Sequence, residues 1–150
     1  MMVGCKREDI LARLVEILNG VTDIKNVARN LDEFPETVRP MAILLDGDEE
    51  AAPELEHIWK KGRAVIIVNM LPLIVVSMGG RPEDVGPDIN ELMARIITAV
   101  MLDQELNDIV TTNGGVYYQR TDYRLNHSLA MDCDLQMIFR IRYPLFPSHP

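Results

Sequence analysis

Two long segments of the chain carry the apolar spacing of an amphipathic helix. The apolar side chains of residues 7–19 recur every three to four positions, and Gly20 follows as a helix stop. The strongest helical stripe lies over residues 86–101, which open on a Gly-Pro-Asp sequence suited to a first turn. After a break, residues 104–110 predict a short further helix. Each apolar stripe needs another layer of structure to cover it.

Alternation and apolar runs predict five strands. Residues 132–143 alternate with a period of two, with Ile138 as the exception, and this is typical of a half-buried antiparallel strand. Residues 63–78 form the longest apolar run and contain Pro72. We therefore expect one long, bent strand with the proline at an edge or a bulge, and a hairpin is the alternative. The remaining strands are expected over residues 23–29, 41–45 and 116–123.

Proline, glycine and charge mark the connections. An Asp-Gly pair at residues 46–47 is a turn signal that should end the preceding strand. The acidic residues 47–62 are expected to form a long loop, in which Pro53 could open a short helix. Residues 30–40 are framed by prolines and predict another loop, and the proline-rich tail 144–150 should be extended.

The order of helix, three strands, broken helix and two strands predicts a single α+β domain over residues 1–150. We expect a two-layer sandwich, in which two long helices cover one face of a mainly antiparallel sheet. A chain of 150 residues, 47% of them hydrophobic, can form its own core without a disulfide or metal. Its two cysteines, Cys5 and Cys133, lack the spacing of a zinc site, which favours a reduced, cytoplasmic setting.

The charge balance excludes several classes of partner. The chain has 15 Lys and Arg against 23 Asp and Glu, a formal net charge of -8. Tight binding to nucleic acid or to an anionic membrane needs clustered basic residues, so both are disfavoured. The longest apolar run is too short to cross a bilayer, and no targeting segment is recognised.

Chemical motifs are weak. Four acids, Asp46, Asp48, Glu49 and Glu50, resemble the paired carboxylates that hold Mg²⁺ in phosphotransfer enzymes, but the further residues of such a site are not found. An EF-hand fails as well, because Ala51 stands where glycine is required. A solvated acidic loop is the favoured interpretation. The histidines have no metal-ligand or catalytic spacing, so we expect no cofactor, no metal and no enzymatic activity.

Tyrosine and arginine are concentrated near the last two strands. Both residue types are enriched at protein interfaces. This surface could be a plain solvent-facing sheet or an assembly interface, and its basic candidates are Arg120, Arg124, Arg140 and Arg142.

Together these segments resemble a known family. The resemblance lies in the N-terminal helix leading into Val-Ala-Arg-Asn at 27–30, in Arg-Pro-Met-Ala-Ile-Leu-Leu-Asp-Gly-Asp-Glu at 39–49, and in the long apolar strand with Pro72. A helix and two closing strands follow. In these features the chain resembles the tail terminator proteins of long-tailed bacteriophages, the minor tail protein U-like family, over most of its length.

The resemblance implies a structural virion protein with no catalytic residues. Such a subunit would form a homo-oligomeric ring, expected to be a hexamer, that caps the tail tube, stops its polymerisation and faces the head-tail connector or stopper protein. Genomic DNA would pass through the lumen without specific binding, and six chains of this acidity would repel it. Asp46, Asp48, Glu49 and Glu50 are the candidates to face that lumen.

Other functions remain open. The chain could be a head-side neck or tail-completion protein, which would share the virion location. It could instead be a non-viral α+β module that binds a ligand or regulates a partner through its sheet. A metal-dependent enzyme using the acidic cluster is the third class.

Overall fold

The computed structural model describes residues 6–30, 40–51, 58–60, 63–80, 82–110, 114–127 and 131–145. Of residues 58–60, 63–66, 82, 124–127, 131–133 and 145 only the backbone is described. In chain order the elements are α1 (Lys6–Asn19), β1 (Asn26–Arg29), β2 (Met41–Ala51), β3 (Ile58–Lys60), β4 (Arg63–Gly80), α2 (Pro82–Met101), α3 (Gln104–Val110), β5 (Gly115–His127) and β6 (Met131–Leu145).

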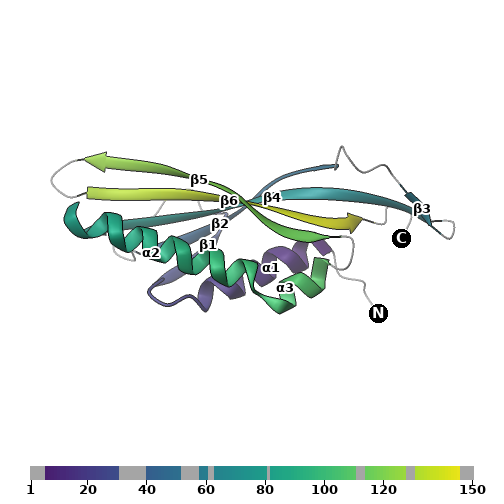
Figure 1. The fold of residues 1–150 in the computed structure, drawn as a ribbon, viewed down its shortest axis with the longest axis horizontal. Coiled ribbons are helices and arrows are strands. Elements are labelled where there is room, and N and C mark those ends of the chain that lie inside the picture. Colours follow the sequence, from purple (N-terminus) through teal and green to yellow (C-terminus); the bar gives the residue numbers. More distant parts are fainter. Residues whose placement is uncertain are drawn as a thin grey trace.

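The strands form one sheet in the order β1-β2-β4-β6-β5, with β3 paired to part of β4. Only β1 and β2 run parallel among the described pairs, and the other pairs are antiparallel. All three described helices lie on one side of this long, twisted sheet (Figure 1). The predicted α+β two-layer sandwich is therefore confirmed. We call the helix-free side of the sheet the far face.

The core lies between the helices and the sheet. From α1 the side chains of Ile10, Leu11, Leu14 and Leu18 are at most 1% exposed, so the predicted stripe is confirmed. The facing strands contribute alternate residues of β4 and β6, which bring Ile74 and Phe139 into the same cluster. Each fully buried side chain of this size contributes about 1.5–3 kcal/mol through the hydrophobic effect.

The longest strands confirm the expected alternation. In β6 the odd-numbered residues from Leu135 to Tyr143 are buried in the core, and Ile138 lies on the far face at 8% exposure. The run over residues 63–80 is a single strand, so the hairpin alternative is wrong. Its proline is accommodated in the middle of the sheet, opposite a β-bulge, and not at an edge.

That bulge corrects the prediction of a turn at residues 46–47. The pairing of β2 with β4 shifts between Leu45 and Asp48, and β2 then continues to Ala51. The extra residue is placed opposite Pro72, which has no N–H to donate to the ladder. Gly47 has φ of +73°, and a Cβ on it would lie 1.9 Å from the carbonyl oxygen of Leu71. A glycine is therefore required where the two backbones approach closely.

The acidic connection is also more ordered than predicted. Residues 47–51 belong to β2, and Ile58–Lys60 form β3 in place of the short helix expected from Pro53. The described sheet therefore has one strand more than the five predicted. Residues 52–57 lie outside the described residues, as do the loop at 31–39 and the end of the tail at 146–150.

The helices differ from the prediction mainly at one end. α2 begins at Pro82, four residues before the expected start, so Pro87 lies inside the helix and not in its first turn, and it cannot donate the hydrogen bond that another residue would make there. The break and the short α3 over Gln104–Val110 are confirmed. None of the described helices combines the length and the hydropathy that a bilayer crossing requires.

Candidate assembly interface

The four acidic candidates do not converge, because β2 presents them to different sides. Asp46 and Glu49 contact arginines of the helix side and of β1. By register with Leu71 and Asn69, Asp48 and Glu50 belong to the far face, and both residues are exposed. The described residues contain no group of three or more metal-ligating side chains arranged around a common point.

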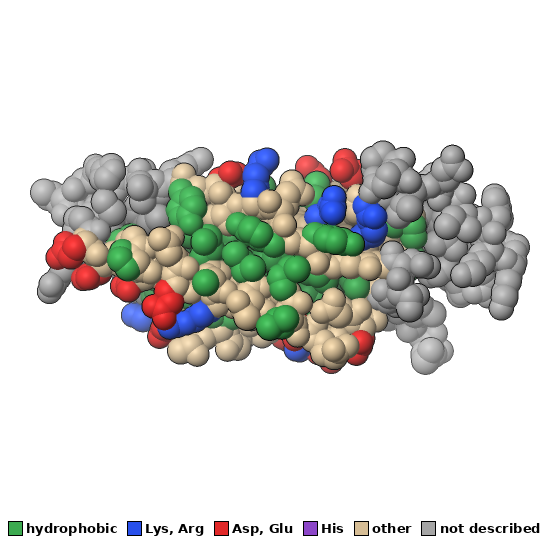
Figure 2. All heavy atoms as spheres, in the orientation of Figure 1, with side chains coloured by type: hydrophobic (Ala, Val, Ile, Leu, Met, Phe, Trp, Pro, Cys, Tyr) green, Lys and Arg blue, Asp and Glu red, His purple; other side chains and the backbone are tan. Residues whose placement is uncertain are grey.

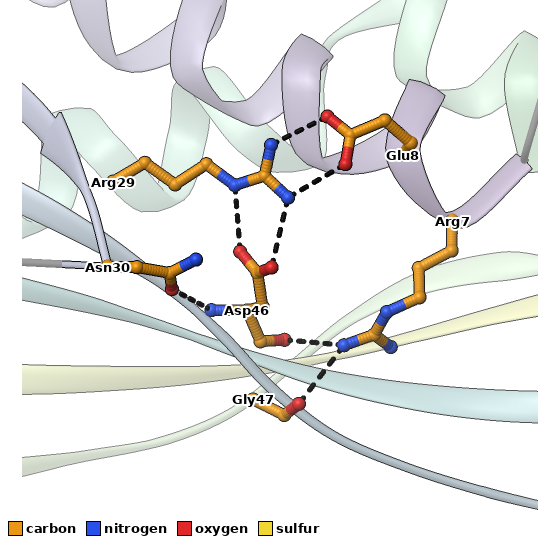
Figure 3. A network of polar contacts seen from close by, with 6 residues as sticks. All are labelled: Arg7, Glu8, Arg29, Asn30, Asp46 and Gly47. Carbon is orange, nitrogen blue, oxygen red and sulfur yellow. Dashed lines mark hydrogen bonds and ion pairs between the residues drawn. The ribbon is translucent and has the colours of Figure 1, made fainter.

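Asp46 is the centre of a network that joins three elements (Figure 3). The guanidinium of Arg29 in β1 donates to both carboxylate oxygens of Asp46, at 2.8 and 3.0 Å, and to both of Glu8 in α1, at 2.6 and 2.8 Å. The backbone N–H of Asp46 donates to Oδ1 of Asn30 at 3.1 Å. These bonds fix the parallel edge of the sheet to the first helix.

A second arginine of α1 holds the bulge from the same side. Arg7 donates to the carbonyl oxygen of Gly47 at 3.1 Å and to Oε1 of Glu49 at 3.2 Å (Figure 3 shows the former). Glu49 also accepts a short hydrogen bond from the hydroxyl of Tyr143 in β6. Two of the four acids therefore have structural partners within the chain.

The hydrogen bonds from Arg29 keep the pKa of Asp46 below its ordinary value, and the bond involving Asn30 acts in the same direction. A carboxylate with a lowered folded pKa stabilises the fold above the unfolded value of about 3.9, and this contribution is lost as the pH falls through the lowered pKa.

We expect the Asp46→Asn variant to be less stable than the parent by about 1 kcal/mol at pH 7. The difference should begin to shrink as the pH falls below about 4, where the unfolded parent takes up a proton, and should vanish below the lowered pKa, where the folded parent also loses the charge. Urea unfolding at several pH values measures it. Asp48→Asn, on the exposed far face, is the matched control and should show no such pH-dependent difference.

The basic candidates meet on the far face of the β5–β6 hairpin. Arg140 and Arg142 lie on the polar side of β6, as predicted, and Arg120 of β5 is in register with Ile138 beside them. Arg124 is in register with Asp134, and its side chain lies outside the described residues.

Each described arginine of this group has a different environment. The guanidinium of Arg140 stacks over the ring of Tyr117, 4.6 Å from its centroid. Arg142 donates to Oδ1 of Asn69 at 3.0 Å. Arg120 is 62% exposed and its Nε lies 3.5 Å from Asp122. A cation stacked on an aromatic ring is pre-positioned, so it loses little side-chain freedom when it binds a partner.

Strand β5 is a free edge of the sheet and carries all the exposed tyrosines of the described residues, Tyr117, Tyr118 and Tyr123. A bulge between Tyr118 and Arg120 divides them between the two faces. Tyr118 packs edge-on against Phe139, and the Tyr123 hydroxyl donates to Oδ1 of Asn90 in α2 at 3.2 Å.

The helix side of this edge adds residues that the sequence pattern assigned to the apolar stripe of α2 and not to an interface. Met93, Ile97 and Met101 recur every four positions along α2 and are only half-buried. Figure 2 shows hydrophobic side chains gathered in a band across the middle of the face that α2 and β5 present. The helical period could have indicated their partial exposure, because each follows a fully buried residue of α2 by one position and so lies at the border of the apolar stripe.

A hollow of about 460 Å³ lies at the other end of α2, between that helix, Pro40 and the loop before β1. Its charged lining includes Asp23, Glu91 and Arg95, and Arg95 donates to both acids at 2.6 Å. These three charges thus bind one another, which leaves fewer charges to recognise a ligand.

No family model and no curated protein matches the chain. Among solved structures, the fold is similar to a chain from the virion of a native gene transfer agent particle. The match covers 93% of this chain and 92% of that chain, with a TM-score of 0.49 and 17% sequence identity. At these values the likeness assigns neither a family nor a function. The candidate interface therefore rests on the side chains of this chain alone.

Proposed function

We propose that the chain is a structural virion protein, a tail terminator that closes into a ring on the end of a phage tail tube. The observation that carries the proposal is the concentration of exposed tyrosine and stacked arginine on one free edge strand and its hairpin partner. The sequence resemblance to tail terminators supports the same assignment.

A ring requires two different surfaces on every subunit, because each copy meets its neighbours head to tail. Tyrosine and arginine supply large contact areas with polar ends and dominate the energetics of such interfaces. The hairpin of β5 and β6 offers them together with backbone groups along the outer edge of β5 that pair with no other described strand.

The proposed partners are copies of the same chain, six in the ring, with the tail tube protein on one side of it and the head-tail connector or stopper protein on the other. Asp48 and Glu50 are the acids of the original cluster that we assign to a DNA-repelling lumen, since Asp46 and Glu49 bind arginines of their own chain. The protein would act in the virion, with assembly in the host cytoplasm, and without a cofactor or a membrane.

We expect native mass spectrometry of the purified protein, mixed with tail tubes encoded by the same genome, to give a sixfold ring bound to tube ends. Electron microscopy should then show tubes that no longer lengthen when more tube protein is added. A chain that stays monomeric beside its tubes, or that consumes a substrate, would contradict the proposal.

A ligand-binding module is the second candidate, and the hollow beside Arg95 is the observation in its favour. It predicts a stable monomer or dimer with no affinity for tubes. A head-side neck protein would form rings but bind connectors in preference to tubes, so the same mixing experiment distinguishes the three functions.

A further inference from the structure

The far face of the sheet carries polar groups whose partners are missing from the described part of the chain. The buried side-chain atoms without a hydrogen-bond partner there are Ser77 Oγ, Asp134 Oδ1 and Arg140 Nε, and by strand register all belong to the far face. Buried polar atoms in native proteins are almost always paired. Of these, Arg140 lies in the stacked pair with Tyr117 on the side without helices, where a second molecule can supply the counter-charge.

Arg140 is the most informative of these residues. It is half-buried, it stacks on Tyr117, and no carboxylate among the described residues pairs with it. A partly desolvated cation without a counter-charge is unfavourable. We define the Arg–Tyr patch as Tyr117, Arg120 and Arg140. Arg120 lies 3.5 Å from Asp122, so Arg140 is the patch arginine without a described counter-charge, on a chain whose formal net charge is -8.

The same chain carries a surface of complementary chemistry on its helix layer. A groove of about 330 Å³ between α1 and α3 is lined by Asp9, Ala12, Arg13, Glu16, Glu105 and Ile109. We call it the α1–α3 groove. The one cation of its lining, Arg13, donates to both carboxylate oxygens of Asp103 at 2.7 and 2.9 Å. Arg13 also forms ion pairs with Glu16 and Glu105. An excess of negative charge therefore surrounds a small apolar floor.

The two surfaces lie on opposite layers of the molecule, since α1 and α3 cover one side of the sheet and the Arg–Tyr patch is on the other (Figure 1). They cannot meet within one chain. Surfaces that are complementary and lie on different sides of one molecule are what a head-to-tail contact between identical copies requires.

We propose that the Arg–Tyr patch of one copy docks into the α1–α3 groove of a second copy. The arginines bind the free sides of the groove carboxylates, and Tyr117 covers the apolar floor. This contact also resolves an electrostatic problem, because two chains of net charge -8 repel each other unless opposite charges meet locally. The inference rests on the proposed function, for which it names the ring contact.

Charge reversal on the patch is the first test. Arg140→Glu is expected to weaken association between copies at least about tenfold, measured by sedimentation velocity, because it places a carboxylate opposite carboxylates. Lys25→Glu makes the same change of charge at an exposed residue outside both surfaces, and its association should stay within about threefold of the parent. Arg140→Gln removes the charge and keeps a polar side chain. It is the second variant if circular dichroism shows that the glutamate disturbs folding.

Reciprocal exchange is the decisive test. Glu105→Arg should also fail to assemble alone, but an equal mixture of Arg140→Glu and Glu105→Arg should recover mixed oligomers. Each variant keeps one native surface, and the two altered surfaces match each other. Rings that contain the two variants in equal numbers, as measured by native mass spectrometry, would support the contact.

The outcomes separate this inference from the proposed function. Parent chains that form no ring even in the presence of tail tubes would contradict the proposed function itself. Rings that form equally well from Arg140→Glu, or a mixture that stays unassembled, would overturn the contact while leaving the ring. Loss of tube binding with unchanged rings would assign the patch to the tube protein and would also overturn it.

Discussion

Replacing Ile96 by aspartate is expected to unfold the domain. Ile96 is 0% exposed in the core between α2 and the sheet, so the carboxylate would be buried without a partner. The expected loss is about 5 kcal/mol or more, which is comparable to the total stability of a typical domain. Loss of the cooperative transition in urea, or its shift to a much lower midpoint, would be the measurement.

The neighbouring residue provides a matched control. The sequence treats Ile96 and Ile97 alike, since both lie on the α2 stripe, but Ile97 is only half-buried. We expect Ile97→Asp to cost far less than the same change at 96, since its carboxylate can reach water. Equal losses of stability at both positions would contradict the different burial of Ile96 and Ile97.

Gly47→Ala has the second largest expected effect. The added Cβ would lie 1.9 Å from the carbonyl oxygen of Leu71, and the residue would also have to keep φ near +73°. Neither backbone can move without disturbing the bulge, so we expect a loss of about 3–5 kcal/mol. For a domain of this size that corresponds to a fall in melting temperature of about 10 °C.

Gly86→Ala is the control for this change. Gly86 is inside α2, and apart from its chain neighbours and the helix backbone nothing among the described residues lies within 4 Å of the position that its Cβ would take. The same substitution should change stability by no more than about 1 kcal/mol, because alanine favours a helix while a Cβ on the residue before Pro87 disfavours one. If Gly47→Ala is as well tolerated, the pairing of β2 with β4 through the bulge is incorrect.

Much of the fold could be predicted because its periods are long and regular. α1, α3 and the alternation of β6 follow from residue spacing alone, since each element buries one continuous face. The middle of β2 could not be predicted in this way. Asp-Gly is a strong local turn signal, and only the proline on the neighbouring strand, 25 positions later at residue 72, makes a bulge the better solution.

The candidate interface was predictable only in part. The arginines of β6 fall on the polar face of a regular strand, so their exposure to the far face follows from the sequence. The tyrosines of β5 do not follow, because the bulge after Tyr118 reverses which residues share a face. The pairing of Arg29 with Glu8 and Asp46 joins three separate elements, and no local pattern contains that information.

The position of β6 in the sheet has a consequence for biosynthesis. β6 is the last of the described strands along the chain, yet it lies between β4 and β5 and supplies the buried Phe139 and Ile141. While the ribosome is still translating this segment, β4 has one side unpaired and α2 has no complete surface to cover. The nascent chain must therefore stay soluble with an open apolar sheet until β6 has left the ribosome, which makes it a candidate for chaperone binding at that stage.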